Sequence, residues 1–157
     1  MNQYGSFHET YKSPYDATDG GSASPIVYDI DGKESFQKIV DLFPIVVVDV
    51  WAPYCNPCKM MAVKYENVAK LFQQHHENHQ IIFMKDNIEQ HDDIHKPHVT
   101  VVPTFFMYVH GKRFHIPDFR EMEITIESAL SDVLQQQQQH TQQMQAQSPP
   151  PPSSARR

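Results

Sequence analysis

One stretch of the chain, residues 45–51, constrains the fold more than any other. It reads Ile-Val-Val-Val-Asp-Val-Trp, a run of mostly β-branched side chains with no alternation between apolar and polar positions. A strand with one face in water would alternate, whereas a strand covered on both faces of a parallel sheet is apolar almost throughout. We therefore place this strand at the centre of a domain.

Shorter patterns on either side of this strand predict the remaining elements. The expected strands cover residues 26–30, 81–84, 104–109 and 112–116, the last two joined by a tight turn at His110-Gly111. The expected helices, from apolar residues at helical spacing, cover residues 33–42, 57–72 and 122–134. Strands that alternate with helices and end in a hairpin and a helix predict an α/β sandwich with a mixed sheet.

The two ends of the chain differ in composition from this central part. Residues 1–24 contain neither the apolar core of a signal peptide nor the basic pattern of a transit peptide. Residues 135–157 are rich in Gln and Pro and cannot bury enough apolar surface to offset chain entropy. We expect a disordered N-terminal arm (1–24), one domain (25–134) and a disordered tail (135–157). Alternatively, the Gln run extends the last helix or mediates self-association, and the prolines at 149–152 bind an adaptor domain.

Composition excludes several classes of function. The chain has 157 residues and a net charge of −6 at pH 7, which argues against a nucleic-acid-binding protein because such proteins carry basic patches. No apolar run reaches the roughly 18 to 20 residues that a membrane-spanning helix needs, so we expect no membrane partner. The 2 cysteines are too few for a disulfide framework or a four-thiolate zinc site. We expect a cytoplasmic protein whose cysteines act as one pair.

The chain also has 10 histidines, which suggests a metal site as one hypothesis. Six of them gather in two places: His75, His76 and His79 at the predicted end of the second helix, and His91, His95 and His98 in a polar loop or short helix. Spacing of i and i+4 can place two imidazoles on one face, but no carboxylate motif completes a ligand set. We therefore expect a solvated polar surface, with no metal and no other cofactor.

Cys55 and Cys58 stand at the junction between the central strand and the following helix. A sulfur at this position lies beside unpaired backbone N–H groups and the positive end of the helix dipole, which favours the thiolate. Cys55 is therefore the predicted nucleophile, and Cys58, on the apolar face of the helix, is the predicted resolving thiol. Two other interpretations remain: a degenerate domain used only for binding, and a metal site, which would need two further ligands.

Three motifs in the right order and spacing resemble the thioredoxin family. Residues 49–59 resemble its active-site segment, residues 102–104 resemble its cis-proline loop, and residues 84–89 resemble the strand that carries its buried lysine. The resemblance covers most of residues 25–134. It implies a thioredoxin fold, in which a central mixed β-sheet is flanked by helices on both faces. It also implies a thiol-disulfide oxidoreductase that reduces protein disulfides through a Cys55/Cys58 cycle.

The resemblance further implies roles for two charged residues beside the cysteines. Asp49 would accept the proton of Cys58, directly or through a water molecule, and Lys85 would tune that carboxylate by proximity. These two residues and the cysteines form the implied catalytic set.

A second implied set binds the client. A cis Pro103, together with Val102, would expose backbone beside Cys55 for strand-like pairing with a client and would keep metal ions off the thiolates. The remaining residues of the implied substrate-binding surface are Trp51, Tyr54 and Pro57. The implied partners are disulfide-containing client proteins and a thioredoxin reductase or glutathione system for recycling.

The chain departs from the family pattern at three places. Asn56-Pro57 replaces the usual Gly-Pro, Tyr54 stands where a second tryptophan is common, and residues 114–119 lack the glycine usually found beside the substrate groove. Pro57 favours a reducing pair over a disulfide isomerase. The rival functions are a disulfide oxidase or isomerase that uses the same pair, and a thioredoxin-like binding or scaffold module with incidental redox activity.

Overall fold

The structure, a computed structural model, describes residues 26–75 and 80–152, so the expected arm (1–24) lies outside the described residues. Its five strands form one sheet in the order β1-β3-β2-β4-β5. The strands are β1 (Val27–Asp29), β2 (Ile45–Trp51), β3 (Ile81–Asn87), β4 (Thr104–Val109) and β5 (Lys112–Ile116). β1, β3 and β2 run parallel, whereas β4 and β5 are antiparallel to their neighbours. The predicted mixed sheet is confirmed.

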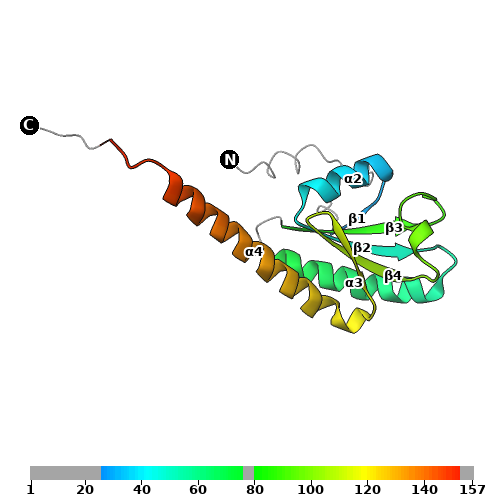
Figure 1. The fold of residues 1–157 in the computed structure, drawn as a ribbon. Helices are drawn as coiled ribbons and strands as arrows, with labels where there is room; N and C mark the ends of the chain where they lie inside the picture. The colour runs from blue at the N-terminus through cyan, green and yellow to red at the C-terminus, as the bar shows by residue number, and fades with distance from the viewer. Residues whose placement is uncertain (1–25, 76–79, 153–157) are drawn as a thin grey trace, which may run out of the picture.

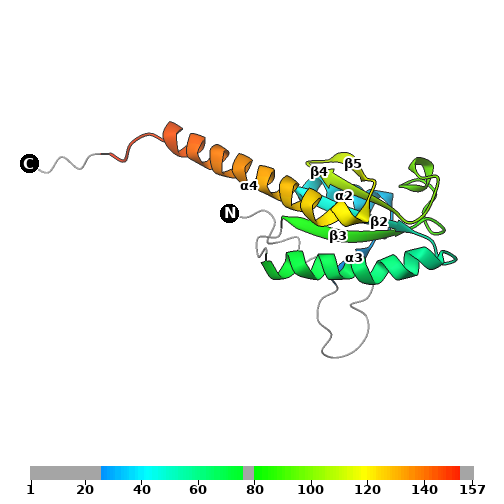
Figure 2. The ribbon, with the colours of Figure 1, turned by 90° about the horizontal axis from the view of Figure 1, so that it is seen from below.

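Helices cover both faces of this sheet, as Figures 1 and 2 show. The helices are α2 (Lys33–Leu42), α3 (Asn56–His75) and α4 (Met122–Gln147), with short 3-10 turns η1 (Lys96–His98) and η2 (Phe119–Glu121). Val46 and Val48 of β2 pack with α2 on one face, while Val47 packs with α3 and α4 on the other. β2 is buried along almost its whole length, as its apolar sequence predicts.

The hairpin between β4 and β5 turns at the predicted dipeptide. His110 has a φ of 47° and Gly111 a φ of 82°, so both central residues are left-handed. Two such residues give the turn type whose twist matches that of the flanking strands. The turn fixes the register in which Val109 pairs with Lys112 and Phe105 with Ile116.

The last helix is longer than the sequence pattern predicts. We expect it to end at Leu134, but α4 continues through the Gln run to Gln147 and projects beyond the domain (Figure 1). Gln is a good helix former, and the first residue that breaks a helix is Pro149, which also disfavours helical backbone at Ser148. For residues 135–147, the structure therefore shows the alternative in which the Gln run extends the last helix. Within the described residues, no helix is long and apolar enough to cross a bilayer.

Candidate active site

A disulfide joins Cys55 and Cys58 where β2 passes into α3. The Cys55 N–H donates to the Ala52 carbonyl oxygen at 3.1 Å, which closes the turn, and Cys55 directly precedes the first residue of α3. The N–H of Cys58 donates to Cys55 Sγ at 3.1 Å. Cys55 Sγ thus takes the place of an N-cap oxygen, where backbone donors and the helix dipole stabilise negative charge on the sulfur.

Both cysteines are buried, Cys58 more completely than Cys55. Cys55 is 7% exposed and Cys58 is 2% exposed, and both pack in a small cluster with Ala52. Trp51 of β2 packs against this cluster, and so do Ile88 and Val102 from the two ends of the β3–β4 loop. A client disulfide therefore reaches Cys55 more readily than Cys58.

The loop that precedes β4 brings its backbone against the disulfide. The peptide bond between Val102 and Pro103 is cis, and the Val102 carbonyl oxygen lies 3.6 Å from Cys55 Sγ. Both residues are only half-buried, and the preceding Val101 is 68% exposed. This arrangement leaves peptide backbone and an apolar side chain accessible beside the sulfur.

Asp49 is a buried carboxyl group on β2, on the face of the sheet that α3 covers. It is 3% exposed, and Oδ1 has no hydrogen-bond partner among the described residues. Burial raises the pKa of Asp49 to about 7, although the positive charge of Lys85 acts in the opposite direction. A carboxyl group with a pKa near neutrality can both accept and release a proton under ordinary conditions.

Lys85 lies opposite Asp49 in the parallel pairing of β2 and β3. Its ammonium is 3.7 Å from the carboxylate of Asp29 on β1 and 5.7 Å from the centre of the Trp51 ring. Sequence reasoning missed Asp29, although the short strand that carries it was predicted. The pairing of Asp29 with Lys85 depends on the β1–β3 register, which no local pattern reveals.

Three of the expected docking residues lie within four positions of Cys55 in the sequence, and Trp51 packs against the cysteines. Trp51 is half-buried with its indole Nε1 unpartnered among the described residues, Tyr54 is 69% exposed, and Pro57 is exposed at the start of α3. Met60, one turn beyond Pro57, is also largely exposed and was not predicted. Apolar surface therefore continues from the disulfide along the first turns of α3.

The predicted solvated surface at His91, His95 and His98 is wrong for two of the three residues. Only His98 is exposed. His95 is fully buried, and both His91 and His95 contact the buried carboxylate of Asp86. The described residues contain no group of three or more potential ligands that could hold a metal ion. His76 and His79 lie outside the described residues.

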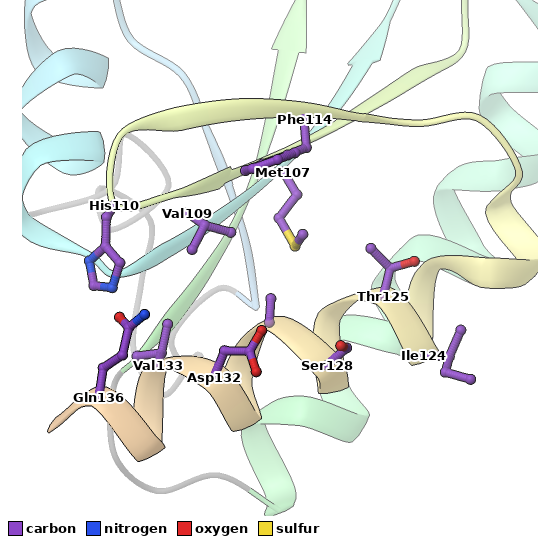
Figure 3. A pocket seen from close by; sticks show the side chains of 11 residues that line it. Met107, Val109, His110, Phe114, Ile124, Thr125, Ser128, Asp132, Val133 and Gln136 are labelled. Carbon is purple, nitrogen blue, oxygen red and sulfur yellow. The ribbon is translucent and has the colours of Figure 1, made fainter. Parts of the chain in front are cut away.

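A separate groove of about 510 Å³ lies between α4 and the β4–β5 hairpin. In Figure 3, Met107, Val109 and Phe114 face it from the hairpin, while Ser128 and Asp132 face it from α4. Neither cysteine lines this groove, so it is not part of the candidate active site.

Comparison with known proteins agrees with this geometry. The thioredoxin family model matches residues 28–136. A thioredoxin from Echinococcus granulosus is 30% identical over 91 residues, which are 57% of this chain and 78% of that protein. The structure of spinach chloroplast thioredoxin f matches with a TM-score of 0.54 and 27% identity, over 66% of this chain and 85% of that one. A protein disulfide-isomerase from Zea mays is 43% identical over 42 residues, which are 27% of this chain and 8% of that protein. The chain therefore belongs to the thioredoxin family and is a thiol-disulfide oxidoreductase.

Proposed function

We propose that the chain acts as a reductant of protein disulfides. The observation that carries the proposal is the position of Cys55, whose Sγ accepts the N–H of Cys58 at the start of α3 and which is the more exposed residue of the pair. In the reduced protein this position favours the Cys55 thiolate, the form that attacks disulfides.

The reaction proceeds in two exchanges. The Cys55 thiolate attacks one sulfur of the client disulfide, which forms a mixed disulfide and releases the other client sulfur as a thiolate. Cys58 then attacks Cys55 Sγ, which breaks the mixed disulfide and releases the second client thiolate. The two electrons of the Cys55/Cys58 dithiol pass to the client, and the protein is left oxidised, as in this structure.

Asp49 is the proposed proton acceptor for Cys58 in the second exchange. The resolving thiol must lose its proton before it can attack, and a carboxylate with a pKa of about 7 can take that proton near neutral pH. Lys85 would tune this step, because its positive charge favours the ionised form of Asp49.

The client would dock across the cis-proline loop. Val102 and Pro103 would offer backbone for strand-like pairing beside Cys55, and Trp51, Tyr54 and Pro57 would supply apolar contact. The resulting disulfide would be reduced again by a thioredoxin reductase or a glutathione system, which fits a cytoplasmic location. The proposed cycle needs no further cofactor.

Insulin reduction with two serine variants tests the proposal. Cys55→Ser should abolish reduction, because the attacking sulfur is gone. Cys58→Ser should stop after the first exchange and accumulate a mixed disulfide between Cys55 and the insulin chain, detectable by mass. Wild-type protein that fails to reduce insulin, or a Cys55→Ser variant that keeps reducing it, would contradict the proposal.

One comparison favours a second candidate function. The segment shared with the Zea mays isomerase leaves open a disulfide isomerase or oxidase that uses the same two cysteines. Such a protein would have a less negative reduction potential than a reductant.

A scaffold with incidental redox activity would instead keep its cellular phenotype in the Cys55→Ser variant.

A further inference from the structure

A network of hydrogen-bonded polar side chains joins the β3–β4 loop to strands β3 and β4. Asp86, at the end of β3, is 0% exposed and so is His95, in the middle of the loop. Nδ1 of His95 lies 2.7 Å from Asp86 Oδ2, and Nδ1 of His91 lies 2.9 Å from Asp86 Oδ1. Nε2 of His95 lies 2.8 Å from the hydroxyl of Tyr108 on β4. Two loop histidines thus meet at the Asp86 carboxylate of β3, and His95 extends the network to Tyr108 on β4.

The chemistry of these groups fixes their hydrogen bonds. An ionised carboxylate only accepts, so both Nδ1 atoms donate to Asp86, and Nε2 of His95 shares a hydrogen bond with the hydroxyl group of Tyr108. Burial acts to raise the pKa of Asp86, but the hydrogen bonds from His95 and His91 outweigh burial and hold the pKa below its ordinary value. Asp86 is therefore an ionised, fully buried group whose partners come from the loop.

Aromatic rings enclose the imidazole of His95. The Phe106 ring is stacked on it with centroids 5.5 Å apart, and the Phe36 ring meets it edge-on at 5.1 Å. Phe36 belongs to α2 and Phe106 to β4, so the imidazole is held between a helix and the sheet. A buried hydrogen-bonded network in such surroundings has little freedom to rearrange.

In the sequence, His95 lies between Ile88 and Val102, the two loop residues that pack against the disulfide. Ile88, near the start of the loop, donates its N–H to the Trp51 carbonyl oxygen at 3.1 Å, and Val102, near its end, carries the carbonyl beside Cys55 Sγ. Both side chains pack against the Cys55/Cys58 cluster. Past His95, η1 continues the loop, with the His98 N–H donating to the His95 carbonyl oxygen at 2.8 Å.

We propose that Asp86 and His95 are positioning residues that hold the Val102–Pro103 segment in the geometry that protein clients need for docking. The inference rests on the proposed function. A protein client pairs with the backbone of this segment, so a loosened loop weakens its binding. A small disulfide needs only the sulfur of Cys55, so its reduction does not depend on the loop in the same way.

The test compares reduction of insulin with reduction of a small aromatic disulfide in matched variants. His95→Phe keeps a ring in the site but removes both hydrogen bonds, and His98→Phe is the control at an exposed position of the same loop. His95→Phe should raise KM for insulin at least about tenfold, the order expected for a lost hydrogen bond to a charged group, while kcat changes less than about twofold. The small disulfide should be reduced within about twofold of the wild-type rate by both variants.

Two further variants separate positioning from folding. His95→Asn places an amide donor near the position of Nδ1, so it should restore KM to within about threefold of the wild-type value. Tyr108→Phe keeps the ring and removes the hydroxyl group that bonds to His95 and Arg113, so it should raise KM by about threefold and remains informative if His95→Phe does not fold. A His95→Phe variant that leaves KM unchanged, or that slows both substrates equally, would overturn the proposal.

Hydrogen exchange distinguishes failure of this inference from failure of the proposed function. If wild-type protein reduces the small disulfide but not insulin, the proposed function fails. The positioning role is then tested only by hydrogen exchange of the loop amides. Amides of Val101 and Val102 should then exchange at least about tenfold faster in His95→Phe than in His98→Phe, with β2 amides unchanged. Equal exchange in the two variants would overturn the positioning role.

Discussion

At the scale of single residues, two buried aspartates on neighbouring strands have opposite pKa shifts because their partners differ. Asp49 faces α3 with one oxygen unpartnered among the described residues, and burial raises its pKa to about 7. Asp86, on the other face, is also buried, yet hydrogen bonds from His95 and His91 keep its pKa below the ordinary value. The first carboxyl group is suited to move a proton, and the second to hold structure.

Replacing Asp49 should change how stability depends on pH. Its pKa is about 7 in the folded protein against an ordinary 3.8, so the folded state binds the proton more tightly than the unfolded state. Stability should therefore fall as pH rises from about 4 to about 7 and stay low above that range. Asp49→Asn removes the charge and should raise the free energy of unfolding at pH 8 by about 2 to 4 kcal/mol.

Urea unfolding of wild-type protein and Asp49→Asn between pH 4 and 8 checks this prediction. The matched control is Asp132→Asn, an exposed carboxyl group whose removal should change the free energy of unfolding by less than about 0.5 kcal/mol. Parallel pH curves for wild type and Asp49→Asn would show that Asp49 is not the titrating group. The same variant should reduce insulin more slowly, since the proton acceptor of Cys58 is lost.

The sequence predicts part of this site and not the rest. Asp49 lies on β2, Cys58 lies on α3 and Cys55 directly precedes α3, so strand and helix patterns place each of them along the chain. The positions of Asp29 and His95 depend on contacts between segments far apart in the chain. Burial of His95 requires α2, β4 and the loop to close around it, and the loop sequence by itself is polar.

At the scale of elements, α4 combines two parts with different surroundings. Ile126, Leu130 and Val133 are buried against the sheet and α3, whereas the side chains of residues 138–152 are exposed. The last anchored side chain is Gln137, which donates its amide N–H to the side-chain oxygen of Gln80 at 2.7 Å. The helical pattern of apolar residues stops at Leu134 because the later residues have nothing to pack against, although their intrinsic preference keeps the helix going.

Deleting residues 138–157 should therefore leave the domain intact. The free energy of unfolding should change by less than about 1 kcal/mol, since the removed side chains that the structure describes, those of residues 138–152, are exposed. Leu130→Ala, in the buried part of the same helix, should cost about 2 to 5 kcal/mol. Denaturant unfolding of the two variants makes the comparison, and a deletion as costly as Leu130→Ala would show that the projecting part of α4 contributes to folding.

At the scale of the whole molecule, the fold brings three distant segments to one end of the sheet. The β2–α3 junction supplies the cysteines, β3 supplies Lys85, and the loop before β4 supplies the cis-proline, in agreement with the order of motifs in the sequence. The alternation of strands and helices predicts the mixed sheet, because each apolar strand needs cover on both faces. The extent of α4 is not predictable in this way, because an exposed helix leaves no apolar pattern.

The reduction potential of the Cys55/Cys58 pair tests the central claim most directly. It is measured by equilibrating the protein in dithiothreitol or glutathione buffers and counting alkylated thiols by mass. Reference values are about −270 mV for thioredoxin and about −180 to −120 mV for isomerase and oxidase types. A protein disulfide reductant requires a potential near or below roughly −250 mV, which is the value we expect. A potential above roughly −200 mV, or no reversible disulfide at all, would contradict the account.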